Sequence, residues 1–412
     1  MGERAAGPLA VVTHCHTRQS RGAASPLDDL IRRAVERVTG APADGFEWAE
    51  SLTTPEQIER LLRPRRGRSS RRGVDLVFVT DHVNETFREL DADLVDLASA
   101  EPRIAIGAEV QTVAEAPAGS GRYRDAPEVL LYGGPDRVRG RGGWHYGVNA
   151  EILRDLQRRC RPAGSRRVEL HRVLAYCRAR GFAHAISHPL DGHGLDLRST
   201  LEALAANKFL EVVNGGYGDH SAARLRRYIR LHNAIVEGGA PARAAVASAD
   251  ARWLLAHLGR SRRPDRVSPG IVPWAGSDAH LGRYDRVCVL YRPRTNRAGV
   301  ADLLRDMVRT PARELRAERV FESEGRGNGL GLVSLEVLRL VVANARATRS
   351  SFRGPRRLLR LAAIAPRVAL GEILRGRREA WRLGRELDAV LAQAAAAIEV
   401  PVRASLSAAT AS

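Results

Sequence analysis

Short apolar segments alternate with helix-like segments along most of the chain, and this alternation limits the fold more than any other feature. Glycine, proline or polar residues bound each apolar segment. The pattern predicts parallel β/α units, so we expect an α/β fold. The predicted strands are residues 9–13, 74–80, 103–108, 128–132, 182–187, 209–213 and 271–276, and residues 287–291 are expected to close or cap the sheet.

Helical periodicity fills the spaces between these strands. Apolar positions recur at a spacing of three and four residues, which indicates one buried face per helix. Segments rich in arginine, glycine, serine and proline separate some of the units and are predicted to be loops or insertions. The predicted helices are 26–38, 91–100, 168–180, 197–207 and 222–237, and the predicted loops are 63–72, 135–149 and 259–270.

The size and composition allow one large or two medium domains with a substantial core. The chain has 412 residues, of which 44% are hydrophobic. Its four cysteines form no CxxC pair, which argues against a disulfide scaffold and a structural zinc knuckle. No run of eighteen apolar residues and no signal peptide is evident. We therefore expect a cytoplasmic protein without a transmembrane segment.

Arginine dominates the charge of the chain. The net charge is +19, yet Lys208 is the only lysine. Residues 346–385 contain twelve arginines and two glutamates, Glu372 and Glu379, so this stretch carries more than half of the net positive charge of the chain. The remainder of the chain is mildly basic, and the high charge alone does not indicate a nucleic-acid partner.

The character of the sequence changes near residue 326. Amphipathic helices are predicted at 332–347, 356–365 and 368–397, interrupted by Pro355 and Pro366. We expect residues 1–325 to form the barrel, 326–400 an Arg-rich helical extension and 401–412 a disordered tail. The stretch 346–385 could pack its apolar face on the barrel with its arginines outward, bind nucleic acid, or lie on an anionic membrane surface.

Polar side chains with metal-binding chemistry follow nearly every predicted strand. In the first, alternation places His14 and His16 on one side of the strand and Cys15 on the other. In a parallel barrel the carboxyl ends of the strands share one rim. The residues at the other strand ends are Asp81, His82, Glu109, His188, Asn214, Asp278 and His280.

So many imidazoles and carboxylates on one rim require a compensating charge, which divalent cations supply. Mixed nitrogen and oxygen ligands suit zinc, manganese or iron, and Glu109 is placed to bridge two ions. Such a pair lowers the pKa of water and stabilises an in-line displacement. Hydrolysis of a phosphate ester therefore fits best.

The ordered motifs HxHT, TDH, GxE, SHP, VNG and GSDAH resemble the PHP family, the polymerase and histidinol phosphatase superfamily, over residues 9–291. The resemblance implies a distorted (β/α)7 TIM-like barrel with two or three metal ions. It also implies a phosphoesterase acting on phosphomonoesters, nucleotides or nucleic-acid ends. The metal ligands carried over by motif are His14, His16, His82, Glu109, His188, Asp278 and His280.

Two positions depart from the family pattern. Gly22 stands where members with three ions have a histidine, which puts the third ion in question. The fourth strand lacks its usual histidine, so His145 from the following loop is a further candidate ligand, or an exposed histidine beside Trp144. Glu128 lies at the wrong end of that strand unless the register differs.

The predicted mechanism assigns a role to each group. His14, His16, Glu109 and Asp278 hold one ion, and Glu109 with His188 holds a second, the two sharing the hydroxide that attacks phosphorus. Binding of a substrate oxygen, or protonation of the leaving group, would fall to catalytic His82 and His280. Asp81 would orient an imidazole. The substrate would be a phosphorylated small molecule or nucleotide, held by Arg18, Asn214 and Arg283.

Two other functions remain open. An amidohydrolase-like metal hydrolase also begins with HxH, but such enzymes commonly use a carboxylated lysine on strand four, whereas Lys208 precedes strand six. The second alternative is a non-catalytic metal-binding barrel whose basic C-terminal helices bind nucleic acid. The sequence does not indicate the oligomeric state.

Overall fold

The computed structural model describes residues 8–17, 53–63, 74–83, 89–115, 121–165, 167–190, 195–214, 221–238, 247–260, 270–278, 287–293, 299–311, 314–315, 317–321 and 355–398. The predicted helices at 26–38 and 332–347, the boundary near residue 326 and the tail 401–412 lie outside these ranges. So does most of the predicted loops at 63–72 and 259–270.

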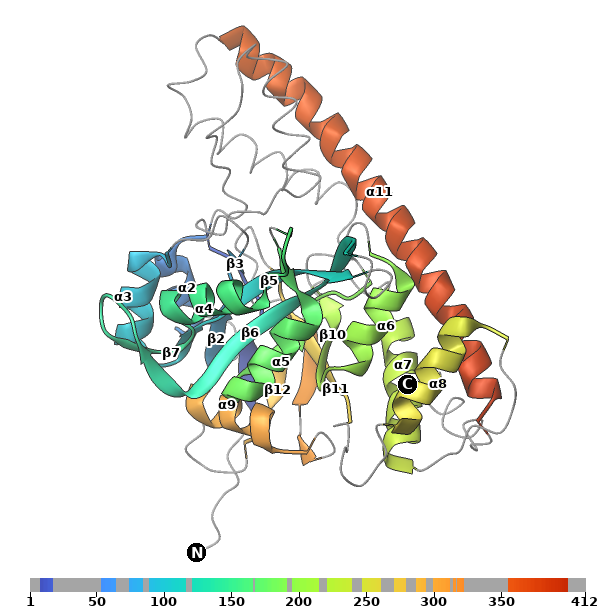
Figure 1. Ribbon diagram of the computed structural model, residues 1–412. Helices are drawn as coiled ribbons and strands as arrows, with labels where there is room; N and C mark the ends of the chain where they lie inside the picture. Colours follow the sequence, from blue (N-terminus) through green and yellow to red (C-terminus); the bar gives the residue numbers. More distant parts are fainter. Residues whose placement is uncertain are drawn as a thin grey trace, which may run out of the picture.

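The strands form one large sheet that curls into a nearly closed barrel, which confirms the predicted α/β barrel class (Figure 1). Parallel pairing joins neighbouring strands in two groups on either side of one reversed strand. The first group comprises β1 (Leu9–Val12), β2 (Leu76–Val79), β4 (Ile104–Ile106) and β7 (Trp144–Gly147). The second comprises β9 (Ala183–Ile186), β10 (Phe209–Asn214) and β11 (Val272–Gly276).

The barrel closes where the carboxyl ends of β1 and β11 meet. The amide of Asp278 donates a hydrogen bond to the carbonyl oxygen of His14 at 2.8 Å, and the Thr13 hydroxyl donates to the Ala275 carbonyl. On its outer edge β1 pairs antiparallel with β12 (Val287–Tyr291), which pairs with β13 (Ala317–Phe321). Residues 287–291 therefore cap the sheet, as predicted.

The reversed strand is β6 (Tyr123–Arg139), which runs antiparallel to β9 and β7. The prediction of uniformly parallel units was wrong here, because an apolar run does not reveal the direction of a strand. Residues 135–149 are also not a loop, since the end of β6 and β7 form a hairpin. The fold thus departs from a regular β/α repeat at its centre.

A side branch of the sheet leaves the barrel beside β6. In this branch β5 (Ala108–Glu115) continues from β4 and pairs with β6, β3 (His82–Val83) and β8 (Val168–Glu169). The pairing of β3 with β5 sets His82 opposite Glu109. This register brings two of the predicted ligands together.

Helices with capped ends cover the outside of the sheet. Asp91, Asn149 and Asp196 each accept a backbone hydrogen bond at a helix start, which offsets the unpaired amides of the first turn. Gly181 ends one helix at a φ of 64°. The helices are α2 (Pro55–Leu61), α3 (Ala92–Ala100), α4 (Ala150–Cys160), α5 (Leu170–Arg180), α6 (Leu197–Ala205), α7 (Ala222–Gly238), α8 (Ala249–Arg260) and α9 (Val300–Arg309).

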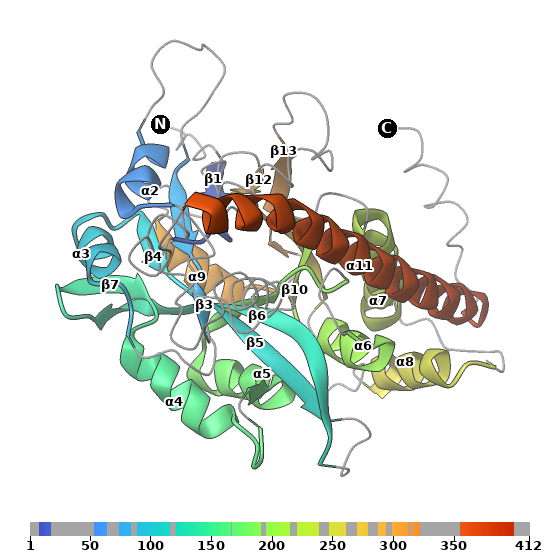
Figure 2. The same ribbon diagram turned by 90° about the horizontal axis from the view of Figure 1, so that it is seen from above.

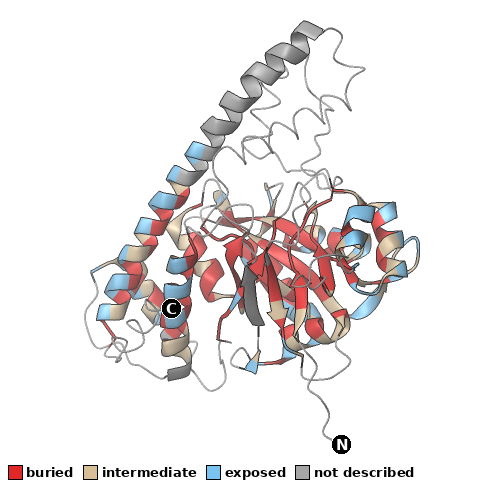
Figure 3. Cartoon of the chain, turned by 180° about the vertical axis from the view of Figure 1, so that it is seen from behind, coloured by how far each residue is buried: buried red, intermediate tan, exposed pale blue. Residues whose placement is uncertain are grey.

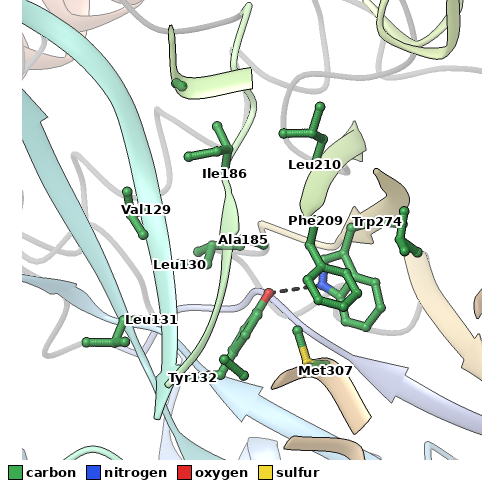
Figure 4. Packing of buried hydrophobic residues seen from close by; sticks show 14 of the residues in the cluster. Val129, Leu130, Leu131, Tyr132, Ala185, Ile186, Phe209, Leu210, Trp274 and Met307 are labelled. Carbon is green, nitrogen blue, oxygen red and sulfur yellow. Dashed lines mark hydrogen bonds between the residues drawn. The ribbon is translucent and has the colours of Figure 1, made fainter. Parts of the chain in front are cut away.

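Buried residues lie along the strands of the barrel and on the inward sides of the helices (Figure 3). Figure 4 shows the central layer, where the Trp274 indole donates a hydrogen bond to the Tyr132 hydroxyl at 3.0 Å. Phe209 packs edge to face on Trp274, with ring centroids 5.0 Å apart. Satisfying the indole and the hydroxyl inside an apolar layer keeps these rings in fixed positions. This layer gives the strand ends a rigid support.

The C-terminal helix α11 (Pro355–Ala396) is continuous, so the predicted break at Pro366 is wrong. An interior proline removes one amide donor, but the helical bonds on both sides persist. The C-terminal half lies beside α7 and α8 (Figures 1 and 2). Leu387 and Leu391 are buried there, and Asp388 pairs with Arg224 at 2.8 Å and Arg227 at 3.0 Å.

This half of α11 thus packs its apolar face on α7 and α8, and most of its buried residues follow residue 385, where the Arg-rich stretch ends. The outward side carries Trp381, 54% exposed, with the Arg385 guanidinium 4.1 Å from its ring centroid. The side chains of residues 355–373 lie outside the described part, so nucleic-acid or membrane binding by the arginines stays a prediction.

The cysteines and the apolarity of the helices bear on two expectations from composition. Cys15, Cys160, Cys177 and Cys288 are buried free thiols, which agrees with the argument against a disulfide scaffold. Among the described helices, none combines the length and apolarity that crossing a membrane requires.

Candidate metal centre

The first strand presents two histidines to one point. Backbone alternation after β1 turns His14 and His16 to the same side, and both are fully buried. Cys15 faces the opposite way, with its thiol 3.4 Å from the Phe78 carbonyl oxygen. The Nε2 atoms of His14 and His16 are 3.0 Å apart. The prediction that the two imidazoles converge is consistent with this geometry.

Four side chains from three parts of the barrel meet at this point. Glu109 Oε2 lies 3.1 Å from His14 Nε2 and 3.2 Å from His16 Nε2. Asp278 Oδ1 lies 3.6 Å and 3.2 Å from the same two nitrogens. Their ligand atoms form a compact buried group of the kind that can hold a metal ion. The sequence predicted these four residues for one ion.

Glu109 also faces a second group of side chains. Its other oxygen, Oε1, lies 3.1 Å from Nε2 of His188, which follows β9. His82 Nδ1 is 3.4 Å from Oε2, and the His82 ring stacks on that of His16 with centroids 4.6 Å apart. The two oxygens of one carboxylate therefore face different histidines. This is the arrangement expected of a carboxylate that bridges two ions.

Sequence reasoning missed Glu211, which lies in β10 and is buried among the predicted ligands. Its Oε1 accepts a hydrogen bond from His14 Nδ1 at 3.0 Å. Its Oε2 accepts from the His188 amide at 2.9 Å, the Ser187 hydroxyl at 3.2 Å and the Asn214 amide group at 3.0 Å. The available signal was a single carboxylate within the apolar segment FLEVVN.

Glu128 is the second residue that the sequence analysis did not place. In a strand parallel to its neighbours, residue 128 would lie at the end away from the rim. Because β6 runs in reverse, residue 128 lies at the rim. Its Oε2 is 3.4 Å from His188 Nε2. Together with His82 and Glu109 it forms a second group whose ligand atoms all lie within 4.8 Å of one another.

The electrostatics of the cluster favour positive charge. Burial opposes protonation of the histidines, but the carboxylates outweigh it. They raise the pKa of His14 well above its usual value, that of His16 to about 9 through Asp278 and Glu109, and that of His188 to about 10 through Glu109. Burial raises the pKa of Glu109, and the histidines lower it well below its usual range. Protons or a metal ion can supply the charge that these contacts require.

Burial raises the pKa of Glu128, and the negative charge of Glu109 raises it further, to about 8. The two carboxyl groups are hydrogen-bonding neighbours, and two like charges at such a distance oppose each other. Glu128 is also the more exposed of the pair, with 18% of its side chain accessible against none for Glu109. It therefore faces the open side of the cluster.

Asp278 has a backbone conformation that few residues adopt. Its φ is 44°, in the left-handed region where asparagine and aspartate are the most tolerated residues other than glycine. This turn directly after β11 aims the carboxylate at His16, while the Asp278 amide holds the end of β1. The strain is localised at one of the predicted ligands.

Asp81 and Asn214 lie beside the cluster and contact the backbone and side chains that shape it. Asp81 accepts hydrogen bonds from the amide and the hydroxyl of Thr17, both at 2.6 Å. It thereby anchors the chain directly after His16. The Asn214 amide group donates to Glu211. Because these hydrogen bonds join Asp81 to Thr17, the orientation of an imidazole by Asp81 stays a prediction, as does the substrate role of Asn214.

Among the remaining predicted site residues only His145 is described, and it is not brought to the cluster. His145 lies in β7, where Tyr146 pairs with Ala105, so it sits at the start of β4 and not at the rim. Its Nε2 lies 3.0 Å from the Val148 carbonyl oxygen, and among the described residues it belongs to neither group of ligands. Arg18, His280 and Arg283 lie outside the described residues.

Comparisons with known proteins add little beyond this geometry. No family model matches the sequence, and no curated protein matches it. A solved structure of an amidohydrolase from Chromobacterium violaceum, with bound sulfate and no metal, is similar to the chain at 16% identity. The match covers 67% of this chain and 89% of that chain with a TM-score of 0.28. The PHP resemblance stays a prediction from the motifs, and the function has to be argued from the site.

Proposed function

We propose that the protein is a metal-dependent phosphoesterase that uses two divalent ions on the rim of the barrel. The observation that carries the proposal is the position of Glu109, whose Oε2 faces His14 and His16 while Oε1 faces His188. A single buried carboxylate between two sets of nitrogens is what a pair of ions requires. The order of the six motifs favours phosphate esters as the substrate class.

The residues present fit a divalent ion. Four ligands at about 2.0 Å from a central ion lie about 3.3 Å from one another if the arrangement is tetrahedral. Five of the six distances among His14 Nε2, His16 Nε2, Glu109 Oε2 and Asp278 Oδ1 range from 3.0 to 3.6 Å, and all four atoms lie within 4.8 Å of one another. Because Nδ1 of His14 donates to Glu211, the lone pair of its Nε2 is directed into the group. The donor set suits zinc, manganese or iron.

The chain's own residues would divide the work. Ions bound there would activate water and stabilise negative charge on the phosphoryl group. Glu211 accepts a hydrogen bond from His14 Nδ1 and so keeps the proton of that histidine on Nδ1. It also accepts from the His188 backbone amide and so fixes the position of His188. His82 is the most exposed described histidine of the cluster, with 12% of its side chain accessible. It is placed to protonate a leaving group, with His280 proposed as its partner.

The substrate would be a phosphomonoester, a nucleotide or a nucleic-acid end. Arg18 and Arg283 follow two ligand motifs closely in the sequence and are proposed to bind phosphate oxygens. The amidohydrolase alternative is less well supported, because Lys208 lies at the amino end of β10 and donates to the Met307 carbonyl at 2.9 Å. The rim of the barrel is at the other end of this strand.

The test is phosphate release from a panel of phosphomonoesters and nucleotides, with manganese or zinc supplied. Wild type would be compared with His188→Ala and with His171→Ala, a matched variant of an exposed histidine that pairs with Glu202. We expect release by wild type and His171→Ala and loss in His188→Ala. Equal release by all three, or none from any substrate, would contradict the proposal. The latter result would favour the non-catalytic barrel that binds nucleic acid.

A further inference from the structure

The reversed strand β6 brings a carboxylate to the rim at a place that no motif marks. Glu128 follows Pro127, whose carbonyl oxygen accepts from the Thr112 hydroxyl at 2.7 Å. On the other side of Glu128, Val129 pairs with Ile186 of β9 and with Val110 of β5. These contacts fix the residues on both sides of Glu128, so its side chain is held at the rim by paired strands.

Glu128 contacts the predicted ligands of the second ion. Its Oε2 lies 3.4 Å from His188 Nε2. Its carboxylate, Glu109 and His82 each offer one ligand atom to a group within 4.8 Å. Two carboxylates this close in a largely buried site are stable together only with a cation or a shared proton between them. A cation also agrees with the His188 imidazole, whose Nε2 faces both carboxylates.

From this geometry we infer that Glu128 is a ligand of the second ion, beside Glu109 and His188. The inference deepens the proposed function and rests on its two-ion part. It supplies the ligand that the fourth strand seemed to lack. It also makes the two sites chemically different. Beside the shared Glu109, the first ion would have His14, His16 and Asp278, whereas the second would have His188 and Glu128. A carboxylate-rich set suits manganese better than an imidazole-rich set does.

The balance of charge supports this assignment. Glu109, Glu128, Asp278 and Glu211 supply four negative charges around two ions that carry four positive charges. Without Glu128, one positive charge would remain uncompensated in a site that is mostly buried. Buried charge that is not compensated is costly, so Glu128 stabilises the loaded state.

The experiment is titration of the metal-stripped full chain with Mn²⁺, monitored by calorimetry and by metal analysis after dialysis. We expect two ions per chain in wild type and one in Glu128→Gln, with the affinity of the second ion lowered at least about tenfold. Glu128→His replaces the carboxylate by an imidazole, which can also bind a metal ion, so this variant should bind the second ion. Glu151→Gln, an exposed glutamate in the first turn of α4, is the matched control and should bind two.

Binding of two ions by Glu128→Gln with wild-type affinity would overturn the inference, as would a single ion in wild type. The thermal unfolding of each metal-free variant shows whether it is folded. Phosphate release is measured separately on wild type. If two ions bind and Glu128→Gln loses one, the ligand role stands even where no phosphate ester is hydrolysed, and only the proposed reaction fails.

Discussion

His14 Nδ1 lies 3.0 Å from Glu211 Oε1, and both side chains are completely buried. Because a carboxylate only accepts, this contact places the histidine proton on Nδ1 and leaves Nε2 for a metal ion. The other oxygen of Glu211 accepts three further hydrogen bonds, one of them from the His188 amide. One carboxylate therefore orients residues of both predicted sites.

Glu211→Gln should weaken metal binding by about 10–100-fold, the range typical of residues that orient a ligand. Glutamine has one oxygen and one NH₂ group in place of the two carboxylate oxygens. It can therefore accept from His14 Nδ1 or from the three donors near His188, but not from both. Calorimetric titration with Mn²⁺ measures the change, and Glu151→Gln serves as a control. Wild-type affinity in Glu211→Gln would show that the carboxylate has only a packing role.

Asp278→Asn should abolish turnover and leave the fold intact. Asparagine tolerates the φ of 44°, whereas alanine there should cost about 1–2 kcal/mol. Loss of a ligand should reduce activity by more than the roughly 100-fold upper range for orienting residues. Urea unfolding of the metal-free proteins should therefore rank Asp278→Ala below Asp278→Asn and wild type. A large loss of stability in Asp278→Asn would indicate that the cluster is mainly structural.

The stability of the metal-free protein should depend on Glu128. Its pKa is raised to about 8, so between the ordinary carboxyl value and pH 8 the folded state holds a proton that the unfolded state has lost. The free energy of unfolding attributable to this group falls as pH rises through that range. Glu128→Gln removes this dependence.

We therefore expect metal-free Glu128→Gln to gain most over wild type near pH 8 and little near pH 5. A gain of about 1 kcal/mol would raise Tm by about 2–4 °C in domains of 150–250 residues. Thermal unfolding in chelator at several pH values gives the comparison. An equal difference at every pH would contradict the assignment of the raised pKa to Glu128.

The C-terminal half of α11 should contribute to the stability of the barrel. Leu387 is 0% exposed and belongs to the core, so Leu387→Ala should cost about 2–5 kcal/mol. Trp381 lies on the outer side of the same helix, and Trp381→Ala should cost less than about 1 kcal/mol. Urea unfolding distinguishes them, and a similar small effect of both would mean that the helix is not part of the folded unit.

The sequence predicts the barrel strands other than β7, and it predicts the convergence of His14, His16, Glu109, His188 and Asp278, because each follows an apolar run and strand ends share a rim. It does not predict the direction of β6, since period and composition are the same for both directions. That single reversal explains why Glu128 was discounted. Glu211 was overlooked because it lies within the predicted strand at 209–213 instead of following it.

Anomalous diffraction from crystals of the full chain grown with Mn²⁺ tests whether Glu109 bridges two ions. We expect two anomalous peaks about 3.5–4 Å apart, one beside His14 and His16 and one beside His188, with an oxygen of Glu109 next to each. A single peak, or ions bound away from Glu109, would contradict such a bridge.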